Sequence, residues 1–261
     1  MKRLRLKKII HLSDLHIGYR DMGKRFGSIA DDIVYLKQPA ENYVIVITGD
    51  IVEKASDSHY RSALRYCTTL RTAGFSVLVV PGNHDYGSGA IALRKNVRVF
   101  KGIFFDSIEV TYPKLDFIGG IAFIGLDSMA EELHWYDALF AQGEQGSAQL
   151  QRLNEMLGDA RVKRCAWRVV YLHHHPFDPR PLHELKDSNE LGEIVRAHGN
   201  IDALLYGHNH EGRIHNGVWG VPRCYDAGSA THKDDGGDYH RVINLERDAR
   251  WDYDADFRMT S

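Results

Sequence analysis

Apolar runs that alternate with helical patterns constrain the fold of this chain more than any other feature. Six runs rich in Val, Ile and aromatic residues are nearly continuous in hydrophobicity, as expected for strands buried on both faces. They are residues 7–12, 43–48, 75–80, 117–126, 167–172 and 202–207. Helical patterns lie between them at residues 57–73, 147–157 and 188–198. This alternation predicts βαβ units and an α/β fold.

Local signals mark where the helices begin and how the fold ends. The predicted N-caps are Asp57, Ser147 and Asp187, the last as part of a capping box. After Gly212, short β-like runs alternate with turn signals and predict antiparallel strands that close the fold. Because no linker, repeat or low-complexity tract interrupts the pattern, we expect one domain over residues 1–261.

Amino-acid composition argues against nucleic-acid binding, a disulfide framework and membrane insertion. The formal net charge is −2 at pH 7, so no net basic field favours nucleic acid, and we expect no stable nucleic-acid complex. The three cysteines are odd in number and lack paired spacing, which indicates reduced thiols and a cytoplasmic location. No apolar stretch approaches the length of a transmembrane helix, so we expect no membrane insertion.

Five polar fragments follow predicted strands, where α/β sheets place their binding residues. They are Asp14-x-His16, Asp50, Asn83-His84-Asp85, the run His173-His174-His175-Pro176, and His208-x-His210. Carboxylate, imidazole and amide donors in this number suit two divalent ions, whether Mn, Fe or Zn. Taken singly, each fragment is more often a turn or a hydrogen-bonded loop. Together they favour a dinuclear metal centre in which Asp50 is the natural bridge.

The fragments SDLH, TGDIVE, PGNHD, HHHP and GHNH resemble the signature of the calcineurin-like metallophosphoesterase superfamily. The resemblance implies a four-layer sandwich of two mixed β-sheets flanked by helices. It implies a first metal held by Asp14, His16, Asp50 and His210. It implies a second metal held by Asp50, Asn83, His174 and His208. His174 is the ligand that the resemblance implies in the histidine run, and His173 and His175 stay open as alternatives.

Two further residues have implied catalytic roles. His84 follows a ligand without being one, and the resemblance implies that it donates a proton or stabilises the phosphate. Glu53 stands three residues after Asp50, where relatives more commonly carry an Asp that orients this histidine; its alternative role is a solvent-facing helix start. Asp85 is interpreted as a turn carboxylate. In the expected mechanism, a hydroxide that bridges the metals attacks phosphorus and His84 assists the leaving oxygen.

Less specific sequence motifs bear on the identity of the substrate. HHHPF, Leu126-Asp127-Ser128 and Ala227-Gly228-Ser229-Ala230 resemble the class III cyclic nucleotide phosphodiesterases. A small phosphodiester, with cyclic nucleotides as candidates, is therefore the expected substrate. Asn83, His84 and Arg180 are its predicted contacts, although such an arginine is more often a surface residue. Residues 129–142 carry aromatic side chains that either cover the site, pack on the domain or form a homodimer contact.

Several other functions remain open at this point. A DNA exo- or endonuclease of the same superfamily shares three of the fragments, but this chain lacks a basic stripe. A lipid-precursor pyrophosphatase typically has Arg where His84 stands. A phosphomonoesterase and a metal-free scaffold on the same fold complete the alternatives, and the scaffold is disfavoured because no predicted ligand is missing.

Overall fold

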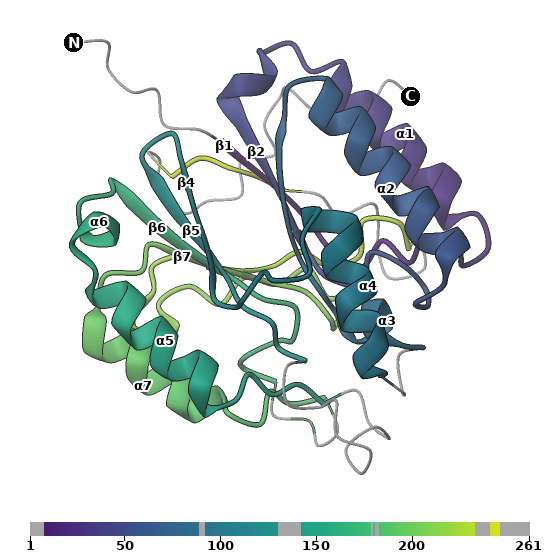
Figure 1. The fold of residues 1–261 in the computed structure, drawn as a ribbon. Helices are drawn as coiled ribbons and strands as arrows, with labels where there is room; N and C mark the ends of the chain where they lie inside the picture. The colour runs from purple at the N-terminus through teal and green to yellow at the C-terminus, as the bar shows by residue number, and fades with distance from the viewer. Residues whose placement is uncertain are drawn as a thin grey trace.

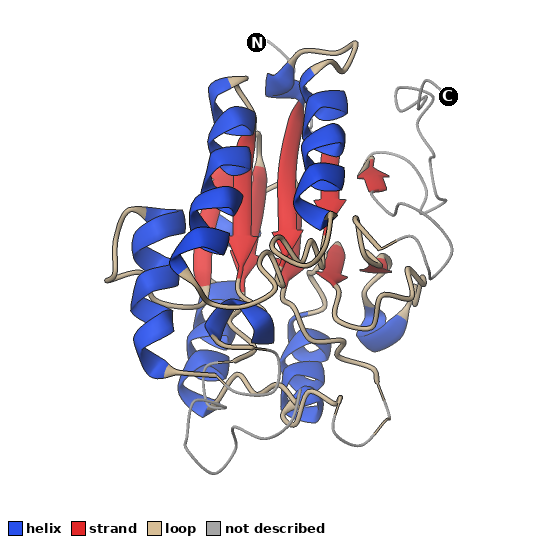
Figure 2. Cartoon of the chain, turned by 90° about the vertical axis from the view of Figure 1, so that its right-hand side faces the viewer, coloured by secondary structure: helices blue, strands red, loops and turns tan. Residues whose placement is uncertain are grey.

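Two mixed β-sheets form the centre of the molecule and helices cover their outer faces (Figure 1). The computed structural model describes residues 8–88, 92–129, 142–178, 180, 183–232 and 241–245. Figure 2, turned by 90°, shows helices standing in front of the strands of one sheet. This architecture confirms the predicted α/β sandwich.

The first sheet has the strand order β3-β2-β1-β9. Its strands are β1 (Lys8–Leu12), β2 (Tyr43–Thr48), β3 (Ser76–Val80) and β9 (Arg241–Ile243). β1 pairs parallel with β2, β2 pairs parallel with β3, and β9 runs antiparallel to β1. The carboxyl ends of β1, β2 and β3 therefore lie at one edge of the sheet.

The second sheet has the order β4-β5-β6-β7-β8. Its strands are β4 (Lys114–Ile118), β5 (Ile121–Gly125), β6 (Trp167–Tyr171), β7 (Ala203–Tyr206) and β8 (Cys224–Asp226). β4 is antiparallel to β5, and the remaining pairs are parallel. Both sheets are thus mixed, as predicted.

The helices divide between the two sheets (Figure 1). On the side of the first sheet lie α1 (Met22–Val34), α2 (Asp57–Thr72), α3 (Asn83–Tyr86) and α4 (Arg94–Phe105). On the side of the second sheet lie α5 (Ser147–Gly158), α6 (Ala160–Lys163) and α7 (Ser188–His198). Two short 3₁₀ turns, Ala40–Asn42 and Val218–Gly220, complete the described elements.

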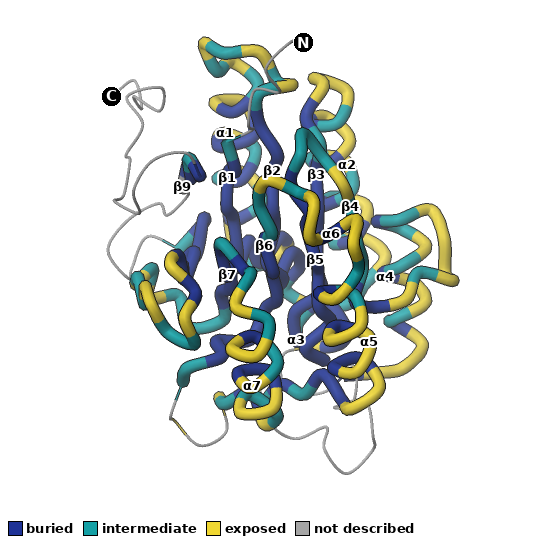
Figure 3. Tube along the Cα trace, turned by 90° about the vertical axis from the view of Figure 1, so that its left-hand side faces the viewer, coloured by how far each residue is buried: buried dark blue, intermediate teal, exposed yellow. Residues whose placement is uncertain are grey.

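Three hydrophobic clusters fill the three interfaces between the four layers. Strand alternation separates them: Ile10 and Ile45 pack under the helices of the first sheet, whereas Ile9 and Val44 pack between the sheets. Most strands are accordingly buried along most of their length, whereas β4, at the edge of the second sheet, is partly exposed (Figure 3). The continuous apolar runs in the sequence reflect this burial on both faces.

Some local predictions were confirmed and others were wrong. The three predicted helices are present as α2, α5 and α7. The N-cap of α2 is Ser56 rather than Asp57, because the Ser56 hydroxyl accepts a hydrogen bond from the backbone N–H of His59. At the start of α7, Asp187 makes no capping bond; its carboxylate accepts from the backbone N–H groups of Gln145 and Gly146 instead.

Strand directions near the end of the chain also differ from expectation. β8 pairs parallel with β7, so the prediction that this segment is antiparallel was wrong, whereas β9 is antiparallel to β1 as expected. The run 117–126 is a hairpin of β4 and β5, in which Gly119 and Gly120 make the turn with φ values of 59° and 83°. The last predicted β-like run, residues 250–257, lies outside the described residues. Within the described part of the chain, no helix has the length and apolar character needed to cross a membrane.

Candidate metal centre

The predicted ligand loops meet at the carboxyl ends of parallel strands from both sheets. The loops that follow β1 and β2 are joined through their backbones. Asp14 N–H donates to the carbonyl of Gly49 at 3.1 Å, and His16 N–H donates to the carbonyl of Asp50 at 3.0 Å. These backbone bonds hold the main chain at three predicted ligands, Asp14, His16 and Asp50, independently of any contact between their side chains.

Left-handed backbone is concentrated in these loops. The described chain has eight non-glycine residues with positive φ, and five of them are predicted ligands. They are Asp14 (53°), His16 (43°), Asp50 (48°), His208 (77°) and His210 (56°). Each such conformation costs about 1–2 kcal/mol and persists only where the surrounding structure imposes it, as it often does at functional sites.

Two glycines allow the loops to approach closely. A Cβ at Gly82 would lie 2.3 Å from Asp50 Oδ1. A Cβ at Gly207 would lie 2.0 Å from Ser13 Oγ and 2.5 Å from Asp14 Oδ2. Any larger residue at either position would displace a predicted ligand, so both glycines are required by the geometry of the site.

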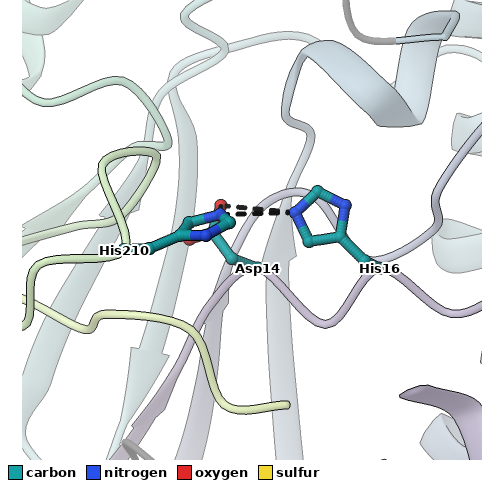
Figure 4. A group of neighbouring side chains, drawn as sticks. All are labelled: Asp14, His16 and His210. Atoms are coloured by element: carbon teal, nitrogen blue, oxygen red, sulfur yellow. Dashed lines mark hydrogen bonds and ion pairs between the residues drawn. The ribbon is translucent and has the colours of Figure 1, made fainter. Parts of the chain in front are cut away.

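The first cluster contains Asp14 and His16 from the loop after β1 and His210 from the loop after β7, and their side chains point toward one another (Figure 4). His210 Nε2 lies 3.2 Å from Asp14 Oδ1 and 3.4 Å from His16 Nε2. Asp50 Oδ2 lies 4.0 Å from His16 Nε2, at the edge of this cluster. These four residues are the predicted ligands of the first metal.

The second cluster is centred on His173. Its Nε2 atom lies 3.1 Å from Asn83 Oδ1, 3.2 Å from His208 Nδ1 and 3.4 Å from Asp50 Oδ2. Its Nδ1 donates to the carbonyl oxygen of Thr48 at 2.7 Å. The same Asp50 oxygen therefore faces both clusters, as a bridging ligand must.

His174 has a different environment from His173. Its Nδ1 is hydrogen-bonded to Ser128 Oγ at 2.8 Å, and its ring centroid lies 4.5 Å from that of His208. No metal-type group of carboxylates and histidines found among the described residues includes His174, whereas one includes His173. The geometry thus favours His173, which the sequence left as an alternative, over His174. His175 packs against Tyr206 and His215, away from both clusters.

His84 and Glu53 lie beside the first cluster. His84 Nδ1 donates to the backbone carbonyl of Glu53 at 2.7 Å, and its backbone N–H donates to Asp50 Oδ1 at 2.9 Å. The Glu53 carboxylate lies 3.0 Å from His16 Nδ1 but 3.8 Å from His84 Nδ1. Glu53 therefore holds His84 through its main chain, while its side chain is directed to His16.

Electrostatics in the clusters couples carboxylates to imidazoles. Burial would raise the pKa of Asp50, but His173 and His84 outweigh it and hold the pKa well below its usual value. Burial opposes the protonation of His210, yet Asp14 raises its pKa to about 8. Burial and the neighbouring His173 lower the pKa of His208. A cation bound at the first cluster would displace the proton that this raised pKa keeps on His210.

The residues present fit divalent metal ions. Donor atoms about 2.0–2.2 Å from one ion lie roughly 3–4 Å apart, which is the spacing within both clusters. Carboxylate, imidazole and amide donors in one site suit Mn, Fe and Zn.

Other predicted site residues lie at the periphery. Arg180 makes an ion pair with Asp178 at 2.7 Å, and its guanidinium lies 3.6 Å from Glu211. It therefore joins two ligand-bearing loops, and its contact with substrate stays a prediction. Asp85 accepts hydrogen bonds from three backbone N–H groups, those of residues 51, 52 and 82, which confirms it as a turn carboxylate. The aromatic segment predicted to cover the site, pack on the domain or form a dimer contact lies, at residues 130–141, outside the described residues.

Sequence reasoning missed His232. Its ring centroid lies 5.3 Å from that of His16 and 5.2 Å from that of His210, and its Nδ1 lies 3.2 Å from Ser229 Oγ. Ser229 in turn donates to the carbonyl of Asp14 at 2.8 Å. The only sequence signal was the small-residue segment 227–230 just before it, which marked the loop but not the histidine.

Comparisons with known proteins agree with this geometry. The family model of the calcineurin-like phosphoesterases matches residues 7–212. The 3′,5′-cyclic adenosine monophosphate phosphodiesterase CpdA of Haemophilus influenzae is 25% identical over 222 residues, which cover 78% of this chain and 70% of that protein.

Solved structures share the fold. A dimetal phosphatase from Danio rerio has a TM-score of 0.67 at 13% identity, covering 91% of this chain and 92% of that one. GAP50, the anchor in the inner membrane complex of Plasmodium, has a TM-score of 0.56 at 12% identity, covering 93% and 85%. At these identities the likeness shows the fold alone. Because the family model spans every ligand fragment, the chain belongs to the calcineurin-like phosphoesterase family and is a metal-dependent phosphoester hydrolase.

Proposed function

We propose that the protein hydrolyses small phosphodiesters at a centre of two divalent metal ions. The observation that carries this proposal is the position of Asp50, whose Oδ2 atom faces His173 in one cluster and His16 in the other. Asp14, His16, Asp50 and His210 would hold the first ion. Asp50, Asn83, His173 and His208 would hold the second. Two ions in these positions would supply Lewis-acid stabilisation of the phosphate and an activated water.

His84 is the residue that assists the leaving group. A backbone carbonyl only accepts hydrogen bonds, so the bond to Glu53 places a proton on His84 Nδ1 and makes Nε2 the atom that exchanges protons. Burial opposes protonation, but the nearby Asp50 carboxylate raises the pKa of His84. The backbone bond to Asp50 keeps the imidazole beside the bridging ligand. His84 can therefore face the phosphate without binding a metal.

Cyclic nucleotides are the first substrates to test. CpdA of Haemophilus influenzae acts, by its name, on 3′,5′-cyclic adenosine monophosphate, and its similarity extends over most of this chain. A diester carries a single negative charge, and its leaving group is an alkoxide that departs poorly unless it is protonated. Two cations that bind the phosphate, together with a proton donor, meet both requirements. The net charge of −2 supports a small substrate rather than a long polyanion.

A substrate panel tests this proposal. We expect the manganese-loaded protein to hydrolyse 3′,5′-cyclic AMP and bis-p-nitrophenyl phosphate faster than p-nitrophenyl phosphate, with little dependence on salt. His84→Ala should lower turnover of cyclic AMP by about two orders of magnitude, and less for p-nitrophenyl esters, whose leaving group needs no proton. Strong cleavage of long DNA that falls steeply with salt, without turnover of cyclic AMP, would instead indicate a nuclease.

A further inference from the structure

Glu53 contacts two histidines through different groups. Its carboxylate lies 3.0 Å from Nδ1 of His16, whereas its backbone carbonyl accepts the 2.7 Å bond from His84. The carboxylate is 0.8 Å farther from His84 than from His16, as the distances of 3.8 Å and 3.0 Å show. Its side chain is about a third exposed, whereas that of His16 is almost fully buried.

The contact with His16 fixes which ring nitrogen can bind a metal. An ionised carboxylate only accepts hydrogen bonds, so His16 Nδ1 must carry the proton. In a neutral imidazole the lone pair is then on Nε2, the atom that lies 3.4 Å from His210 Nε2 and 4.0 Å from both Asp14 Oδ1 and Asp50 Oδ2. This is the tautomer needed for His16 to bind an ion through Nε2.

We propose that Glu53 is a positioning residue for the first metal: its carboxylate orients His16 and fixes its tautomer, while its backbone alone holds His84. The inference rests on the proposed dinuclear centre and extends it to a residue that does not bind the ion. It differs from the role implied by the family pattern, in which the acid at this position orients His84. Glutamate has one methylene more than aspartate, so its carboxylate has a longer reach, and here that carboxylate lies nearer His16 than His84.

One alternative uses the same three residues. His16, Glu53 and His84 place one potential ligand atom each within 4.8 Å of one another, which is compatible with a third ion. The 2.7 Å bond from His84 Nδ1 to the Glu53 carbonyl disfavours that alternative, because the nitrogen already has a partner. The number of ions bound per chain separates the two: the proposal requires two and the alternative three.

Metal binding measured without substrate tests the proposal. The metal-free full chain is titrated with Mn²⁺ against a competing chelator, for the wild type, Glu53→Gln and Glu53→Ala. We expect two binding steps in the wild type. Glu53→Ala should weaken one step about tenfold or more, the usual effect of losing a partner of a ligating histidine. Glu53→Gln should weaken the same step less, because its amide oxygen still accepts a hydrogen bond.

A control variant and a double variant test whether Glu53 affects metal binding through His16 or through His84. Glu155 lies on α5, where its carboxylate accepts a hydrogen bond from Gln151 rather than from a predicted ligand, so Glu155→Gln should leave both steps unchanged. The loss caused by Glu53→Ala should be the same when His84→Ala is also present. If both binding steps survive in Glu53→Ala while turnover falls, Glu53 acts on His84 and the proposal is overturned. Loss of a third ion, or equal weakening of both steps, overturns it as well.

A second measurement needs no variant. In zinc-loaded wild-type protein with ¹⁵N-labelled histidine, His16 should show a proton on Nδ1 and none on Nε2. The opposite tautomer overturns the proposal even if Glu53→Ala fails to fold. Because neither measurement uses substrate, a failure to hydrolyse phosphodiesters would refute the proposed function and leave this inference standing.

Discussion

His173 and His174 are neighbours at the end of β6, yet they have different partners. His173 Nε2 lies within 3.4 Å of Asn83, His208 and Asp50, whereas His174 Nδ1 bonds to Ser128. We predict that His173→Ala loses one of two bound ions and nearly all turnover, while His174→Ala retains both ions. Metal analysis of the two purified variants checks this. Two ions retained in His173→Ala, and one lost in His174→Ala, would restore the assignment made from the family pattern.

Asp50 is the residue on which both clusters depend. Asp50→Asn removes the charge shared by the two predicted ions while it preserves the shape of the side chain, and an amide can still accept from His84 N–H. We therefore expect weaker binding at both metal sites and no measurable turnover, with the fold intact by circular dichroism. Normal activity together with two bound ions in this variant would contradict the bridging role.

At the scale of elements, the loops after β1 and β7 touch at Gly207. A methyl group there would meet Ser13 Oγ at 2.0 Å and Asp14 Oδ2 at 2.5 Å, so Gly207→Ala must separate the loops. We expect a loss of about 1–3 kcal/mol in the free energy of unfolding, together with weaker binding of one metal ion. Gly158→Ala, whose new methyl has no neighbour nearer than 3.9 Å, is the control and should not destabilise the protein. Equal melting temperatures for both variants would show that the loops can separate freely.

The loop after β5 is held to α3 by a buried carboxyl group. Asp127 accepts from the Tyr86 hydroxyl at 2.9 Å and from Met129 N–H, and burial raises its pKa to about 6. Because the folded pKa lies above the unfolded value, the folded state binds more protons between about pH 4 and pH 6, and stability falls as pH rises through that window.

This pH dependence can be isolated by substitution. The free energy of unfolding is measured in urea at pH 4 and at pH 6.5. Its decrease between these two pH values should be smaller in Asp127→Asn than in the wild type by on the order of 2 kcal/mol, since an amide does not ionise. Asp57→Asn, whose side chain is 80% exposed in the first turn of α2, serves as the control for general charge effects. An unchanged pH dependence in Asp127→Asn would show that Asp127 does not titrate in this range.

Over the whole molecule, the sequence predicted the sheets better than the details of the site. Six apolar runs located β1, β2, β3, β5, β6 and β7, because burial on both faces imposes a continuous hydrophobic pattern, whereas the fourth run covered only the end of β4 and did not predict the hairpin. The direction of β8 could not be predicted, because a strand of three residues is too short to show a periodic pattern. Its parallel pairing with β7 depends on the tertiary structure. Adjacent side chains at a strand end face opposite ways, so the histidine run by itself could not decide between His173 and His174.

Metal stoichiometry against activity tests the central claim most directly. Metal-free protein is titrated with Mn²⁺ while hydrolysis of bis-p-nitrophenyl phosphate and of p-nitrophenyl phosphate is followed, and bound metal is measured at each point. We predict no activity without metal, a rise that levels off at two ions per chain, and faster turnover of the diester. Full activity in the presence of a chelator, a plateau at one ion per chain, or turnover of the monoester alone would contradict a dinuclear phosphodiesterase.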